Sequence, residues 1–177
     1  EDNAAAAEHL ATYIKNSPED ARARENLAGV LGRLKRYGEA SDALAAILSG
    51  QDAAARRHIE ATYLLLRAGR YKEADEMIPA DGAPAFGAIL RALARKGMGE
   101  PHRPIFESLD AIETDIDEEC GQFLNELLYL FGKADAGDYL ISALGEARKE
   151  GIQSKTLDIF FARVLMALDR QQEAESA

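Results

Sequence analysis

The pentapeptide Arg36-Tyr37-Gly38-Glu39-Ala40 recurs 34 residues later as Arg70-Tyr71-Lys72-Glu73-Ala74, and this recurrence constrains the fold more than any other feature. The flanking positions keep the same spacing, since Leu31 corresponds to Leu65. A weaker third copy, Arg-Gln-Gln-Glu-Ala, occupies residues 170–174. A fixed period of this length is typical of arrays of stacked helical units, in which each unit buries its apolar face against its neighbours.

Apolar residues recur at spacings of three and four along most of the chain, whereas no segment shows the alternation of a half-buried strand. Ten helices are predicted, at 3–15, 18–36, 38–48, 53–67, 72–78, 84–96, 103–112, 117–131, 135–149 and 154–168, with part of an eleventh at 171–177. Ser17 and Pro18 are interpreted as the N-cap and the first residue of the second helix. We therefore expect an all-α fold of paired antiparallel helices.

Composition excludes several classes of function. The 31 acidic and 21 basic residues give a net charge of −10, which disfavours binding to nucleic acid or to an anionic membrane. No apolar run approaches the ~20 residues that cross a bilayer, so membrane insertion is not expected. The single cysteine, Cys120, cannot form an intramolecular disulfide, and this leaves both the cytoplasm and the periplasm open.

Residues 21–52 and 55–78 resemble the tetratricopeptide repeat (TPR) in their 34-residue period and in the Arg-Tyr-x-Glu-Ala turn between helices. The positions that match the small and apolar residues of that family are Ala28, Ala40, Leu44, Ala74, Ile78 and Ala174. Arg24, His58 and Gly137 depart from the family pattern. The resemblance implies an antiparallel helix-hairpin solenoid, wound as a right-handed superhelix with a concave groove.

On this interpretation the chain is one TPR-like helical repeat domain, 1–177. It divides into a half repeat at 1–17, repeats at about 18–52, 53–82, 83–114 and 115–152, and a truncated repeat at 153–177. Because the chain starts without methionine and ends within the third motif copy, we expect it to be a fragment of a longer protein, with further TPR repeats at both ends.

In TPR proteins the first helix of each pair lines the groove. The residues that this geometry places there are Arg33, Arg56, Tyr63, Arg67, Arg91, Arg95, Tyr129 and Arg163. The second helices carry the acidic residues Glu39, Asp42, Glu73, Asp75, Glu76, Glu107 and Asp110. Arginine binds carboxylates through paired planar donors, so the groove is predicted to hold an acidic or carboxylate-bearing segment of another protein. The alternative is that these arginines pair with Glu25, Glu60 and Glu126 on the same face, where exposed pairs contribute little.

The sequence offers no catalytic or metal-binding pattern. The acidic stretch 115–121 resembles a calcium loop only loosely, because Cys120 stands where such a loop requires glycine, and its acids are expected to stabilise a helix start instead. His9, His58 and His102 lack partners at ligand spacing, so no metal or cofactor is predicted. Cys120 is interpreted as a buried packing residue. Phosphate-loop and serine-elbow motifs are missing as well, and we expect no enzyme activity.

The TPR resemblance implies a protein–protein interaction scaffold that binds a partner peptide or domain in its concave groove. The alternative is a structural TPR spacer segment within a larger secretion or envelope assembly, such as one for polysaccharide export. Tyr37 and Tyr71, at the turns between paired helices, are interpreted as packing residues.

Overall fold

The computed structural model describes residues 2–48, 55–78 and 84–169, and these ranges contain helices and turns but no strand. The helices are α1 (Asn3–Asn16), α2 (Ala21–Arg33), α3 (Tyr37–Ala45), α4 (Ala55–Arg67), α5 (Tyr71–Met77), α6 (Pro84–Gly97), α7 (Arg103–Glu107), the 3-10 turn η1 (Leu109–Ala111), α8 (Ile116–Glu119), the π-helical η2 (Cys120–Leu124), α9 (Asn125–Phe131), α10 (Lys133–Lys149) and α11 (Lys155–Ala167). The all-α class is confirmed. The third motif copy and the eleventh predicted helix lie outside the described residues.

The repeated pentapeptide forms the same turn in both described copies. The amide of Arg36 donates to the carbonyl of Leu31 over 2.9 Å, and the amide of Arg70 forms the equivalent bond at the same length. The residue before each arginine has a positive φ, 61° at Lys35 and 72° at Gly69. The left-handed residue reverses the chain, so the next helix starts within two residues.

Two further features of the pentapeptide hold this turn. The guanidinium of Arg36 donates to both carboxylate oxygens of Glu39, at 2.7 and 2.6 Å, and Arg70 binds Glu73 at 2.8 and 2.6 Å. The alanine that closes each copy is fully buried where the paired helices cross. The small side chain allows the two backbones to approach closely.

The predicted start of the second helix is wrong by three residues. Ser17 ends α1, and Asp20 is the N-cap of α2, where its Oδ1 accepts a hydrogen bond from the amide of Ala23 at 2.9 Å. The second oxygen of Asp20 accepts from the Tyr13 hydroxyl at 3.1 Å. An ionised carboxylate with two donors provides a better cap here than the Ser17 hydroxyl, and Pro18 lies in the intervening turn.

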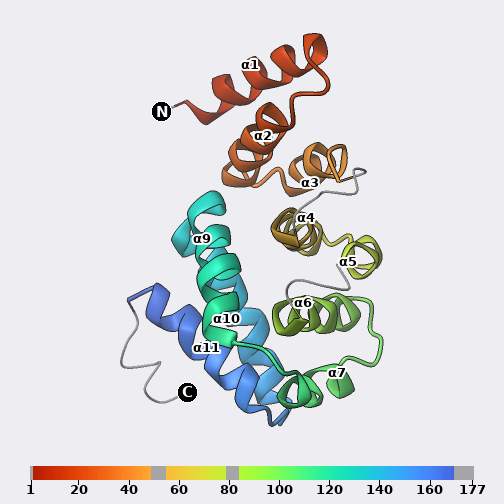
Figure 1. Ribbon diagram of the computed structural model, residues 1–177, viewed down its shortest axis with the longest axis vertical. Helices are drawn as coiled ribbons and strands as arrows, with labels where there is room; N and C mark the ends of the chain where they lie inside the picture. Colours follow the sequence, from red (N-terminus) through yellow and green to blue (C-terminus); the bar gives the residue numbers. More distant parts are fainter. Residues whose placement is uncertain (1, 49–54, 79–83, 170–177) are drawn as a thin grey trace.

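Helices α1 to α7 follow one another in a row, each in contact with the next (Figure 1). A solenoid would continue in this manner, with contacts to neighbours alone. Instead, residues 116–131 form one helical stretch, made of α8, η2 and α9, that returns along the row: α8 contacts α6, η2 contacts α4 and α9 contacts α2. Helix α10 packs on α9, and α11 packs on α10 and on η1. We call residues 116–131 the return helix.

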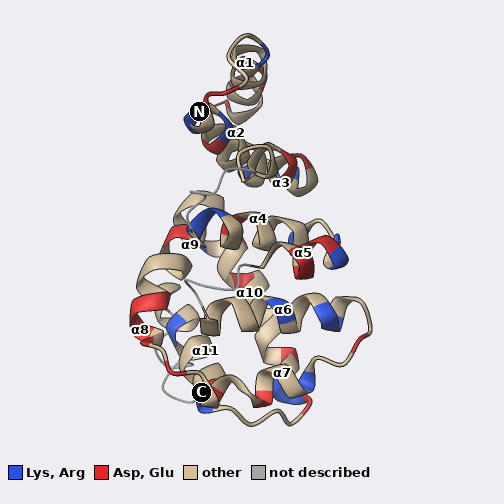
Figure 2. Ribbon diagram, turned by 45° about the vertical axis from the view of Figure 1, so that its right-hand side comes forward, with Lys and Arg blue, Asp and Glu red and all other residues tan. Residues whose placement is uncertain are grey.

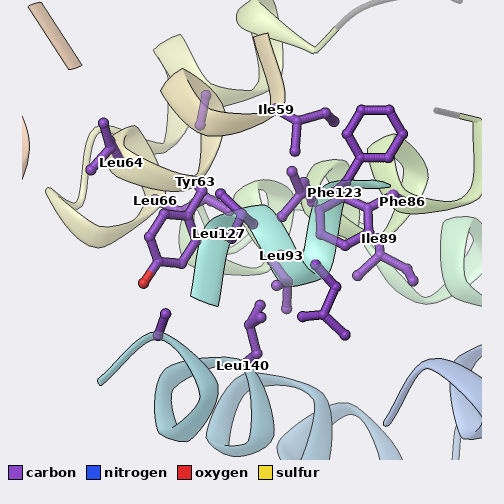
Figure 3. Close-up of a cluster of buried hydrophobic side chains, with 14 of the residues drawn as sticks. Ile59, Tyr63, Leu64, Leu66, Phe86, Ile89, Leu93, Phe123, Leu127 and Leu140 are labelled. Carbon is purple, nitrogen blue, oxygen red and sulfur yellow. The ribbon is translucent and has the colours of Figure 1, made fainter. Parts of the chain in front are cut away.

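The return helix lies in the main hydrophobic core, between the row and the last two helices. Phe123 packs near Phe86 of α6, and Leu140 of α10 lies on the other side of the cluster (Figure 3). A Cβ at Gly32 of α2 would lie 2.4 Å from Cδ1 of Phe131, closer than atoms can pack. Glycine at position 32 therefore makes room for the end of the return helix. None of the described helices combines the length and the apolar character needed to cross a membrane.

Candidate interaction site

The eight residues predicted to line a partner groove lie in four separate places. Six of them stand on α2, α4 and α6, which are the helices that the return helix crosses. Figure 2 shows basic residues on α4 and α6 and acidic residues on the neighbouring α5 and α8, so the row does not present a surface of one sign. All six were expected to face a partner, but three of them bind residues 126–135 of the same chain: Arg33, Arg56 and Arg67.

Arg67 and Tyr63 belong to a largely buried cluster where α4 meets α3 and α10. The Arg67 side chain is 12% exposed, and its guanidinium lies 4.3 Å from the ring centre of Tyr37 and 4.8 Å from that of Tyr139. It donates to the Tyr63 hydroxyl at 2.7 Å and pairs with Asp135 at 3.0 Å. Burial opposes ionisation of Asp135, yet the hydrogen bonds from Tyr37 and Lys35 and the charge of Arg67 lower its pKa. This arginine therefore holds helices together.

Arg91 and Arg95 lie against α5. Both pair with the carboxylate of Asp75, at 3.5 Å and 3.2 Å, and Arg95 also lies 3.8 Å from Glu100. The sequence assigned Asp75 to the opposite surface, so the structure corrects that separation of charges. The arginines and the acid meet because α5 and α6 are neighbours in the row, and Asp75 lies on the side of α5 that faces α6.

Arg163 lies apart from the others, beside the start of the return helix. Its guanidinium pairs with Asp117 at 2.6 Å, and both residues line a pocket of about 310 Å³ together with Cys120. Cys120 is 5% exposed, and burial raises the pKa of its thiol to about 12. The interpretation of Cys120 as a buried packing residue is confirmed, because its side chain belongs to the hydrophobic core.

Arg33, Arg56 and Tyr129 surround one open pocket of about 260 Å³ where α9 meets α2 and α4. Its lining consists of Glu25, Asn26, Gly29, Arg33, Arg56, Glu60, Tyr129 and Leu130. We call it the α2–α4–α9 pocket. Tyr129 stands at its edge with 81% of its surface exposed, the largest value among the large apolar side chains that the structure describes.

The arginines of this pocket are paired within the chain. Arg56 lies 2.7 Å from Glu126, 3.6 Å from Glu60 and 4.0 Å from Glu25. Arg57 also pairs with Glu25, and Arg33 donates to the carbonyl of Leu130 at 3.1 Å. The alternative proposed from the sequence, pairing with the three glutamates, is therefore confirmed for Arg56.

Glu60 is the unusual residue of the pocket. It is 3% exposed, and its Oε1 is buried without a hydrogen-bond partner among the described residues. Burial raises the pKa of Glu60 to about 7; the charge of Arg56 opposes this, and those of Glu126 and Glu25 add to it. From the sequence, Glu60 was predicted only as a partner for arginine. The signal that could have marked it is its place as the single carboxylate within residues 59–66, all of which the structure buries.

Several acidic residues accept hydrogen bonds from amides at helix N-termini. Asp110, predicted on an outer face, accepts hydrogen bonds from the amides of Thr156 at 2.7 Å and Lys155 at 2.9 Å and from the Ser154 hydroxyl at 2.8 Å. The Thr156 amide contributes most to lowering the pKa of Asp110 to about 2. Asp115 caps α8, which confirms that the acidic stretch 115–121 stabilises a helix start. These carboxylates are already used by the fold.

Comparisons of the chain with protein-family models, with curated proteins and with solved structures find no match. Within residues 2–48, 55–78 and 84–169, no group of three or more histidine, cysteine, aspartate or glutamate side chains is arranged to hold a metal ion. The functional argument therefore depends on the residues of the α2–α4–α9 pocket and its surroundings.

Proposed function

We propose that the chain is a protein–protein interaction scaffold that presents the α2–α4–α9 pocket to a segment of a partner protein. The exposure of Tyr129 beside a charged pocket is the observation that carries this proposal. Tyrosine is enriched at protein interfaces, because its ring supplies contact area while its hydroxyl stays compatible with water. In the free chain this ring leaves most of its surface in solvent.

The surface beside Tyr129 extends the proposed site. Tyr129 also lines a second hollow of about 430 Å³, together with Asn125, Leu128, Lys133 and Ala167. Asn125 and Ala167 in turn border the pocket that contains Arg163, where Met166 is 49% exposed. Three adjoining hollows along the exposed side of the return helix would provide an extended track for a peptide or a helix.

The relation to TPR proteins is part of the proposal. The recurrent turn with its paired arginine and glutamate, and the buried alanine after it, support that relation in the first half of the chain. In the proposed arrangement the return helix occupies the concave side, and a partner binds beside it. The acidic partner expected from the sequence stays a prediction, and peptides of opposite charge can distinguish it from a basic partner.

A structural spacer within a larger assembly is the second candidate. It is favoured by the internal use of Arg56 and Arg67, since residues that hold helices together need no partner. On this view the pocket would be a surface feature without a ligand.

The two candidates differ in what Tyr129 touches in the cell. We would replace Tyr129 with the photo-crosslinking residue p-benzoylphenylalanine, and use Lys72, exposed on α5, as the matched control position. Irradiation of cells should give a discrete adduct from position 129 and none from position 72. The adduct would then be identified by mass spectrometry. Equal labelling at both positions, or none at 129, would favour the spacer.

A further inference from the structure

We propose that the α2–α4–α9 pocket receives a lysine side chain of the partner segment, with the ammonium group bound beside Glu60. This inference rests on the proposed function, and it reverses the partner charge predicted from the sequence. It follows from which polar groups in the pocket already have close partners and from the one buried carboxylate oxygen that receives no hydrogen bond.

The charge of Arg56, on α4, is already paired within the chain, and Arg33 donates one hydrogen bond to the backbone. Arg56 reaches Glu126, Glu60 and Glu25, and the acceptor for Arg33 is the Leu130 carbonyl. An incoming carboxylate would have to compete for these donors, and it would meet Glu25 and Glu60, which line the pocket as acids. The negative charges of Glu25 and Glu60 would repel a carboxylate inside the pocket. The chain as a whole, with a net charge of −10, repels an acidic segment further.

The acceptors, in contrast, are in excess at one place. Glu60 lines the pocket, its side chain is 5% exposed, and its Oε1 receives no hydrogen bond within the described part of the chain. The nearest cationic group, on Arg56, stays 3.6 Å away. A buried carboxylate oxygen without a donor is costly, so a ligand that supplies a donor gains the energy that the free chain lacks.

An ammonium group fits this need better than a guanidinium. It is a compact charge with three donors, which Glu60 and Glu25 can share from neighbouring helices. The aliphatic stem of a lysine can lie along the apolar edge formed by Tyr129 and Leu130. A pocket of about 260 Å³ that already contains Arg33 and Arg56 offers little room for a third planar guanidinium.

The test uses three tripeptides that differ only in the central side chain: Ac-Ala-Lys-Ala-NH2, the same peptide with Nε-acetyl-lysine, and Ac-Ala-Glu-Ala-NH2. Each is titrated into the isotopically labelled chain at pH 8, and amide shifts are followed by NMR. The lysine peptide should move the signals of Glu60 and Tyr129. Its apparent Kd should rise about tenfold or more with the acetylated peptide or in Glu60→Gln, because a charge-assisted hydrogen bond is lost. Glu76→Gln, an exposed site on α5, should leave binding unchanged.

Three results would overturn the inference: a response to the glutamate peptide alone, equal binding of both lysine peptides, or no response near Glu60. A response to the glutamate peptide would restore the acidic partner predicted from the sequence. The inference and the proposed function can fail separately. If the photo-crosslink at position 129 captures a partner but the lysine peptide does not bind, only the lysine inference is lost.

Discussion

Replacing Glu60 with glutamine removes a buried charge while keeping the shape of the side chain, so it tests directly how the pocket is built. Burial raises the pKa of Glu60 from an ordinary value of 4.5 to about 7. A carboxyl with a higher pKa in the folded state binds its proton more tightly when folded. The contribution of Glu60 to the free energy of unfolding therefore falls as the pH rises from 4.5 to 7.

The size of this loss follows from the two pKa values. Each tenfold change in proton affinity is worth about 1.4 kcal/mol, so complete ionisation of Glu60 in the folded chain removes about 3 kcal/mol. The groups that face Glu60 are Arg56 and Arg57 on α4, Glu25 on α2 and Glu126 on α9, and the arginines reduce the loss. The glutamine variant carries no charge there and should escape it.

The measurement is urea unfolding of the wild type and of Glu60→Gln at pH 5 and pH 8. The difference in unfolding free energy between the two proteins should change by up to about 3 kcal/mol in favour of the variant at pH 8. Glu76→Gln, exposed on α5, serves as the control and should show no such change. A difference that is the same at both pH values would refute the view that Glu60 is a buried carboxylate without a sufficient donor.

Three further variants test the fold. Gly32→Ala should lower the free energy of unfolding by about 1–3 kcal/mol, measured by urea unfolding, because its Cβ would displace the ring of Phe131; unchanged stability would mean that α2 and α9 are further apart. Arg67→Lys should lower the melting temperature, because an ammonium group cannot stack on two rings while pairing with Asp135; a full rescue by lysine would show that charge alone matters. Asp110→Ala should destabilise the chain by about 1 kcal/mol through loss of its hydrogen bonds to the first-turn amides of α11, and amide exchange should rise first at the start of that helix.

Local structure was predictable because it depends on residues close together in the sequence. The turn after α2 and the turn after α4 both follow from the pentapeptide, whose arginine binds the glutamate three residues on. The start of α2 was misplaced at Ser17, because two acceptors, Ser17 and Asp20, compete within a few residues, and the Tyr13 hydroxyl adds to the second.

The candidate site was only partly predictable. Tyr129 and Arg56 were named from the sequence, and they do border one pocket. The role of Glu60 was missed because its importance comes from burial and from an absent donor, neither of which appears in a helical periodicity. The acidic partner predicted from the arginines stays a prediction, whereas the alternative named from the sequence, pairing with Glu25 and Glu126, is what α2 and α9 bring to Arg56.

The all-α class, the positions of the first hairpin turns and the apolar faces of the helices all follow from the order of the residues alone. Those properties depend on spacing of three and four residues and on short turn motifs. The packing position of residues 116–131, in contrast, depends on contacts with helices that are distant in the sequence. That segment is apolar on several sides, and apolar periodicity shows that a helix is buried without showing what covers it. The space left at Gly32 for Phe131 directs the return helix back across α6, α4 and α2, and this path creates the pocket.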